Sequence, residues 1–112
     1  MLALYLAGIA DRYKERFQAA APSIRFVEGK TGLDAIEEAD IVVACFEIDT
    51  AYYETAFEIG MAKALGKRVI LIDEMPSDAR SLDMLRASCD ARFDTLDKGI
   101  KMIQTLNVLA AR

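Results

Sequence analysis

The chain contains no histidine and only two cysteines among its 112 residues. Without histidine, neither a Ser-His-Asp triad nor a Cys-His pair can form, so any catalysis must rely on carboxylates and hydroxyls. Cys45 lies inside an apolar run and Cys89 in a helical tail, and they do not form a Cys-x-x-Cys pair. This spacing argues against a disulfide scaffold and against a zinc site.

The sequence also lacks a long apolar run and an excess of basic residues. The apolar run at residues 2–7 is too short for a signal sequence, and no run approaches the length of a membrane span. We therefore expect a cytoplasmic protein. The formal net charge is -4, which gives no general attraction to nucleic acid or to anionic membranes.

What is present suits one globular domain spanning residues 1–112. The composition is 54% hydrophobic and 29% charged, which is enough to build a core but leaves no room for a separate substrate domain. Apolar runs predict strands at residues 2–7, 24–28, 41–46 and 68–73, with a short fifth strand at 91–93. Helical patterns fall between them, at residues 11–21, 33–39, 54–65, 82–88 and 96–111.

This alternation predicts an α/β fold, a three-layer sandwich around a mostly parallel, flavodoxin-like or Rossmann-like sheet of about four or five strands. Residues 41–46 are continuously apolar and rich in β-branched side chains, which is typical of a central strand covered on both faces. In such sheets the ligand binds beyond the carboxyl ends of the strands. We expect Glu58, in the first turn of the helix after residues 41–46, to face that crevice.

Three common functions of this fold class are excluded by their motifs. A receiver domain needs an aspartate at the carboxyl end of the central strand, whereas Asp40 stands at its start. The dinucleotide fingerprint and the phosphate loop need glycine patterns that the turn after Gly8 does not supply.

Three segments together resemble the nucleoside 2-deoxyribosyltransferase family and its N-glycosidase relatives. They are Tyr5-Leu6-Ala7-Gly8, Glu38-Ala39-Asp40-Ile41-Val42-Val43-Ala44 and Thr55-Ala56-Phe57-Glu58-Ile59-Gly60-Met61-Ala62-Lys63-Ala64-Leu65-Gly66-Lys67. The resemblance extends from the amino terminus to about Asp73. It implies that Glu58 attacks the anomeric carbon of a deoxynucleoside, and that a second base or water then resolves the glycosyl ester.

The resemblance also implies roles for other residues, and no metal or organic cofactor. Tyr5 is expected to bind the sugar or orient Glu58, and Gly8 to let the backbone approach the ligand. Where the family usually has an aspartate, a glycine and a small hydroxyl residue, this chain has Tyr52, Glu54 and Thr55. A further catalytic aspartate of the family aligns with Gly32, and Asp34 is the candidate to replace it.

Structural explanations compete with several of these assignments. Thr55 and Glu58 also match a capping box, and Tyr5 suits a buried position with a satisfied hydroxyl. Asp40 either binds substrate or caps the strand that it precedes. Three further carboxylates, Asp49, Glu54 and Asp73, are each either a solvated charge or a substrate contact. Because the family has glycine at the position of Glu54, this side chain either fills the sugar pocket, supplies the missing second carboxylate or faces solvent.

The predicted function is binding of a nucleoside or nucleoside monophosphate and, if the protein is an enzyme, cleavage or exchange of its N-glycosidic base. The differences from the family at Gly32, Tyr52 and Glu54 favour hydrolysis or weak transfer over efficient base exchange. The alternative is a catalytically degenerate nucleotide-binding or oligomeric scaffold of the same fold. The carboxyl-terminal helix has more apolar residues than a single covering face requires, so we also expect a homodimer or higher homo-oligomer.

Overall fold

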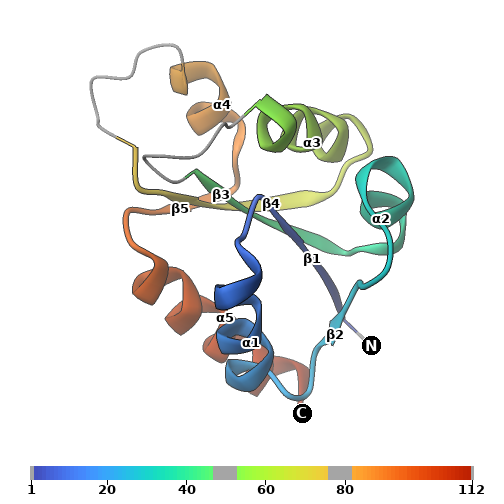
Figure 1. The fold of residues 1–112 in the computed structure, drawn as a ribbon, viewed down its shortest axis with the longest axis vertical. Helices are drawn as coiled ribbons and strands as arrows, with labels where there is room; N and C mark the ends of the chain where they lie inside the picture. Colours follow the sequence, from blue (N-terminus) through green and yellow to red (C-terminus); the bar gives the residue numbers. More distant parts are fainter. Residues whose placement is uncertain (1, 47–52, 76–81, 112) are drawn as a thin grey trace.

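The computed structural model describes residues 2–46, 53–75 and 82–111 (Figure 1). The described strands are β1 (Ala3–Ala7), β2 (Arg25–Phe26), β3 (Ile41–Phe46), β4 (Arg68–Asp73) and β5 (Ala91–Phe93). The described helices are α1 (Asp11–Ala20), α2 (Gly32–Glu38), α3 (Tyr53–Ala64), α4 (Asp83–Ser88) and α5 (Leu96–Ala110). Each predicted element is confirmed, although β2 is shorter than the pattern suggested.

The strands form one parallel sheet in the order β2-β1-β3-β4-β5. This is the flavodoxin-like arrangement, so the predicted fold class is confirmed. β3 is the central strand, as its continuous apolar run predicted, and every residue from Val42 to Phe46 is buried. A parallel strand needs cover on both of its faces, which explains why β3 has no polar alternation.

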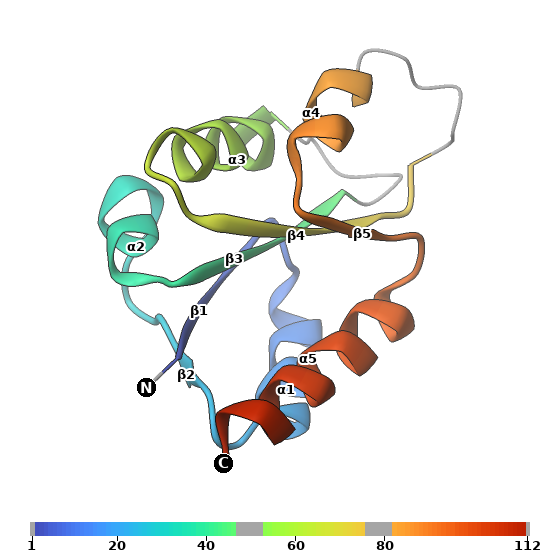
Figure 2. The ribbon, with the colours of Figure 1, turned by 180° about the vertical axis from the view of Figure 1, so that it is seen from behind.

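Helices cover both faces of this sheet and make it the middle of three layers (Figures 1 and 2). On β1, Ala3, Tyr5 and Ala7 join the core beneath α2 and α3, whereas Leu4 and Leu6 join the core beneath α1 and α5. Successive residues of a strand point to opposite faces, so this alternation fixes which residues of β1 can reach α3.

Most of the apolar face of α5 is used inside the chain. Ile100 and Ile103 are buried against the sheet, and Met102 and Leu106 pack beside them. Of the residues that suggested a subunit contact here, Leu109 remains 57% exposed. Among the described helices, none has both the length and the apolar character needed to cross a membrane.

An ion-paired cluster ties α4 and β5 to the carboxyl end of β4. The buried carboxylate of Asp73 accepts a hydrogen bond from Arg86 Nε at 2.5 Å and lies 3.3 Å from Arg92 Nε. It also accepts a hydrogen bond from the backbone amide of Met75. These contacts give Asp73 a structural role at the carboxyl end of β4. The sequence alone could not decide between a solvated charge and a substrate contact for this residue.

The turn that follows β1 depends on Gly8. Its φ of +72° lies in the left-handed region, and a Cβ atom at this position would overlap Thr55 Oγ1 and lie 2.9 Å from the carbonyl oxygen of Cys45. Glycine therefore lets the end of β1 approach both α3 and β3. In this structure the group that approaches Gly8 closely is the protein itself, whereas the sequence had suggested a ligand.

We predict that Gly8→Ala lowers the free energy of unfolding by about 2–5 kcal/mol, measured by urea denaturation. The left-handed backbone costs about 1–2 kcal/mol and overpacking against Thr55 and Cys45 about 1–3 kcal/mol. Gly29→Ala is the matched control, because Gly29 has a φ of +73° but no atom within 4 Å of its Cβ position. Gly29→Ala should lower the free energy of unfolding by the backbone contribution alone. An equal loss of unfolding free energy in Gly8→Ala and Gly29→Ala would contradict the packing argument.

Candidate functional site

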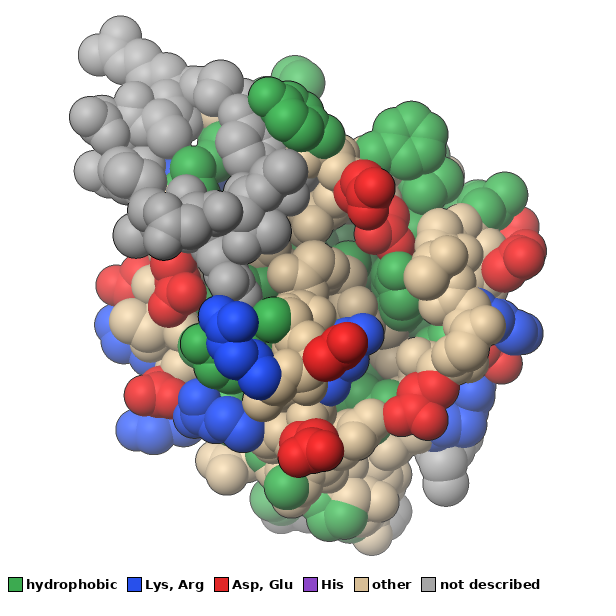
Figure 3. Space-filling model, in the orientation of Figure 1, with side chains coloured by type: hydrophobic (Ala, Val, Ile, Leu, Met, Phe, Trp, Pro, Cys, Tyr) green, Lys and Arg blue, Asp and Glu red, His purple; other side chains and the backbone are tan. Residues whose placement is uncertain are grey.

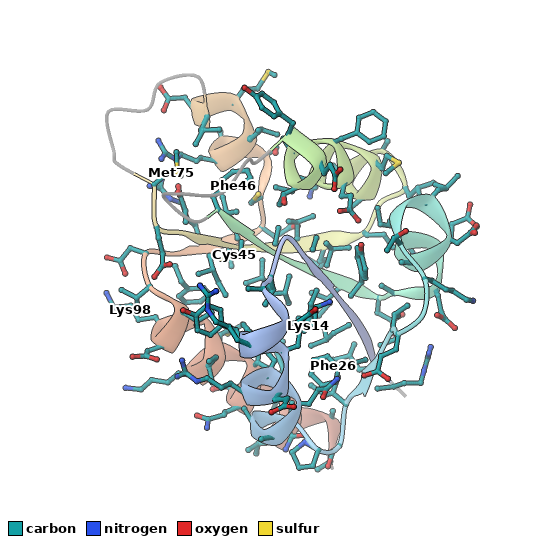
Figure 4. All side chains as sticks on the ribbon, viewed as in Figure 1. Lys14, Phe26, Cys45, Phe46, Met75 and Lys98 are labelled. Carbon is teal, nitrogen blue, oxygen red and sulfur yellow. The ribbon has the colours of Figure 1, made fainter. Side chains whose placement is uncertain are left out.

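The candidate site lies at the carboxyl edge of the sheet, beside the junction of β1 and β3. From β1 the chain crosses outward to β2, and it then returns to the other side of β1 to form β3. This reversal is the topological switch point, where the flanking connections diverge and leave a crevice. Figure 4 labels Cys45 and Phe46 at the carboxyl end of β3.

A hydrogen bond between β1 and α3 is at the centre of this crevice. The hydroxyl of Tyr5 donates to Glu58 Oε2 at 2.5 Å, joining residues 53 positions apart in the sequence. Tyr5 is only 7% exposed, and Glu58 is half-buried. The structure thus brings together the two residues that the sequence placed first, and Tyr5 is both a core residue and a partner of Glu58.

The position of Glu58 on its helix differs from the prediction. Helix α3 begins at Tyr53, so Glu58 lies in the second turn and the expectation of a first-turn carboxylate was wrong. Thr55 is the third residue of the helix and is buried, so it cannot be the N-cap of a capping box with Glu58. The helix dipole acts mainly within the first turn, whereas Tyr5 contacts Glu58 directly through a hydrogen bond.

A cleft of about 670 Å³ opens between α2 and α3 in front of Glu58. Glu54, Phe57, Glu58 and Met61 line it from α3, at spacings that share one helix face. The remaining lining residues are Thr31, Gly32, Leu33 and Tyr53. Figure 3 shows apolar side chains gathered around acidic ones on this part of the surface, so the cleft combines apolar walls with two carboxylates.

A second cleft, of about 350 Å³, adjoins the first at Thr31, which lines both. Tyr5 and Phe26 form part of its wall, and Lys14, Glu28 and Lys30 supply charged groups. Lys14 and Phe26 are labelled in Figure 4. Tyr5 lines the second cleft, and its hydrogen-bond partner Glu58 lines the first.

The environment of Tyr5 keeps its hydroxyl protonated. Burial raises its pKa well above the ordinary value, and the hydrogen bond to Glu58 and the negative charge of Glu58 raise it further. The charge of Glu54 acts in the same direction, whereas a hydrogen bond from the backbone of Gly32 partly opposes these effects. Tyr5 is therefore a hydrogen-bond donor to Glu58 at physiological pH.

The other predicted site residues are placed differently. Glu54 lines the same cleft as Glu58, but Asp34 is exposed in the first turn of α2 and is not among the residues that line the cleft. Asp40 lies at the opposite edge of the sheet, where its carboxylate accepts a hydrogen bond from the Ala3 amide at 2.8 Å. Asp49 and Tyr52 lie outside the described residues.

Two contributors to the site carry no recognisable signal in the sequence. Gly32 approaches Tyr5 through its backbone, although alignment had marked it only as a lost aspartate. Lys14 enters the second cleft from α1, a helix whose sequence pattern pointed only to packing. In the described ranges, no three His, Cys, Asp or Glu residues are grouped closely enough to hold a metal ion.

Comparison with known protein families gives one match over most of the chain. The family described as nucleoside 2-deoxyribosyltransferase YtoQ matches residues 10–107. No curated protein matches the sequence significantly.

Solved structures similar to this chain share its fold at low sequence identity. The CMP N-glycosidase BcmB of Clostridium botulinum has a TM-score of 0.66 and 21% identity, over 90% of this chain and 97% of its own. A 2-deoxyribosyltransferase of Bacillus psychrosaccharolyticus has a TM-score of 0.62 and 19% identity, over 88% and 90%. A conserved protein of Enterococcus faecalis V583 reaches a TM-score of 0.51 at 20% identity, over 96% and 88%.

We predict that the wild-type protein loses stability more steeply than Tyr5→Phe as the pH rises above about 10, the ordinary pKa of tyrosine. The folded state holds the Tyr5 proton more tightly than the unfolded state, so this contribution is complete below that pH and is lost above it. Urea denaturation of both proteins between pH 8 and pH 11 measures the difference. If the free energy of unfolding depends on pH in the same way in both proteins, the pKa of Tyr5 is not raised in the folded state.

Proposed function

The chain belongs to the nucleoside 2-deoxyribosyltransferase YtoQ family, and we propose that it cleaves the N-glycosidic bond of a nucleoside or nucleoside monophosphate through Glu58. The observation that carries this proposal is the hydrogen bond from Tyr5 to Glu58 at the wall of a 670 Å³ cleft. A half-buried carboxylate with a fixed donor on one oxygen keeps its other oxygen available for reaction.

In the proposed reaction, that second oxygen of Glu58 attacks the anomeric carbon of the bound sugar. The bond between this carbon and the base breaks, and its electron pair leaves with the base. The carboxylate also stabilises the positive charge that develops on the sugar before the ester forms. Tyr5 remains protonated and holds the carboxylate in one orientation, because its pKa is raised.

The shape and chemistry of the clefts support this class of substrate. Phe57 and Met61 give the first cleft apolar walls, against which a planar base can stack. Lys14 and Lys30 border the adjoining cleft, where a cationic side chain favours an anionic group such as a 5′-phosphate. The similarity to a CMP N-glycosidase and to a 2-deoxyribosyltransferase agrees with substrates of this kind.

Hydrolysis is the proposed outcome, with transfer to a second base as the weaker activity. The cleft in front of Glu58 is broad and open to solvent on the described surface (Figure 3). Water therefore has easier access to the glycosyl ester than in an enclosed pocket, and a second base has no closed site to hold it in place.

We predict that Glu58→Ala lowers turnover at least about a thousandfold, because covalent catalysis is lost with the nucleophile. The purified protein would be incubated with deoxynucleosides and their monophosphates, with and without a second free base, and the products separated by chromatography. Glu15→Gln, an exposed carboxylate change on α1, is the matched control and should keep wild-type activity.

Four outcomes of that experiment, together with melting temperatures measured with the same compounds, separate the possible functions. Released base identifies hydrolysis, and exchanged nucleoside identifies transfer. Consumption that persists in Glu58→Ala would contradict the nucleophile. If no compound is consumed but several raise the melting temperature, the protein is the catalytically degenerate nucleotide-binding scaffold instead.

We also propose that the protein forms a homodimer through the face built by α3 and α4. Tyr53, Phe57 and Met84 are 75%, 69% and 82% exposed on these helices. Exposed apolar side chains on two neighbouring helices are typical of interaction surfaces. The α5 surface that the sequence suggested is the alternative location, since Leu109 remains exposed there.

We predict that Met84→Glu weakens this dimer at least tenfold, about 1.4 kcal/mol, because it buries a carboxylate in an apolar contact. Sedimentation over a range of protein concentrations measures the dissociation constant. Leu109→Glu on α5 is the comparison variant and should leave the dimer unchanged. Dissociation by Leu109→Glu alone would place the interface on α5, and a monomeric wild-type protein would contradict dimerisation.

A further inference from the structure

Two carboxylates stand one helical turn apart in the same cleft. Glu54 and Glu58 are at positions i and i+4 of α3, and both line the cleft between α2 and α3. Side chains at this spacing are neighbours on one helix face, with their Cβ atoms about 5–6 Å apart. Retaining glycosidases likewise use two carboxyl groups beside one glycosidic bond.

The surroundings of the two carboxylates differ in a way that suits different roles. The hydroxyl of Tyr5 donates a hydrogen bond to Glu58 and fixes the orientation of that side chain. Glu54 is exposed at the start of α3, so its side chain can rotate toward a base that enters the cleft. The effect of its charge on Tyr5 shows that it acts on the same small region.

We propose that Glu54 is the general acid and base of the glycosidic reaction, a role that rests on the proposed function of Glu58. In this division of roles, Glu58 is held by the Tyr5 hydroxyl and is the nucleophile. The exposed Glu54 gives the proton to the leaving base and later takes one from water.

Each step conserves atoms and charge. As Glu58 forms its bond to the anomeric carbon, the bond from this carbon to the base breaks, and Glu54 gives its proton to the departing base. Glu54 is then a carboxylate and takes a proton from a water molecule. The water oxygen attacks the anomeric carbon, the ester bond to Glu58 breaks, and both residues return to their starting states.

Other described groups are less suited to this role. Asp34 is exposed on α2 and is not among the residues that line the cleft. The proton of Tyr5 is engaged by Glu58, and its raised pKa makes it a poor acid. The chain has no histidine, which removes the side chain most often used for proton transfer near neutral pH.

The test compares leaving bases that need a proton with bases that do not. We would measure wild-type, Glu54→Gln, Asp34→Asn and Glu58→Ala proteins on 2′-deoxyguanosine and 7-methyl-2′-deoxyguanosine, and on 2′-deoxycytidine and 3-methyl-2′-deoxycytidine. The methylated bases are cationic in the nucleoside and leave as neutral molecules without protonation. Spontaneous release without protein is subtracted, and circular dichroism checks that each variant is folded.

The expected result is selective. In kcat/KM, which reports the step that releases the base, Glu54→Gln should lose about a hundredfold or more on the unmethylated nucleosides, the usual contribution of general acid catalysis. It should lose less than about tenfold in kcat/KM on the methylated ones, where the base needs no proton. Glu58→Ala should lose activity on both kinds of substrate, and Asp34→Asn should not show the selective loss.

Two results would overturn the role of Glu54 while leaving Glu58 in place. One is an equal effect of Glu54→Gln on methylated and unmethylated substrates, including no effect on either. The other is a selective loss in Asp34→Asn, which would assign the proton to Asp34. If the wild-type protein releases no base from any of the four substrates or from the wider panel of nucleosides and monophosphates, the proposed function itself fails.

Discussion

The site depends on the parallel pairing of β1 with β3 at the point where the order of the sheet reverses. Tyr5 pairs in register with Val42, and this pairing turns its ring toward α3 while Leu4 and Leu6 face the opposite layer. A slip of one residue would exchange these faces and remove the donor from Glu58. The apolar burial of β1 therefore fixes the chemistry at its carboxyl end.

Close packing around that pairing fixes the position of the helix that carries the site. Gly8 allows the turn after β1 to approach Thr55 and Cys45 closely, which fixes α3 relative to β1 and β3. Farther along the sheet edge, the buried ion pairs of Asp73 with Arg86 and Arg92 attach α4 and β5. Glu54 and Glu58 therefore lie on a helix that packs against the end of β1 on one side and against α4 on the other.

Acidic residues of this chain lie in different electrostatic environments, and these environments give them different roles. Asp73 is neutralised by arginines inside the protein, whereas Asp40 accepts a backbone hydrogen bond at the far edge of the sheet. Glu58 is stabilised by a tyrosine hydroxyl, and Glu54 remains exposed in the cleft. These four acidic residues therefore have four different environments, and two of them share the cleft.

The sequence by itself determined the order and type of the helices and strands. The spacing of apolar residues differs between a strand and a helix, and this spacing can be recognised within a short stretch of sequence. The sequence also singled out Glu58 and Tyr5, since a short family-like motif surrounds each. It could not place Glu54 inside the cleft, Asp34 and Asp40 away from it, or Lys14 beside it. Those positions depend on how α1, α2 and α3 pack across the sheet, and contacts between residues far apart in the chain exist only after folding has brought these helices together.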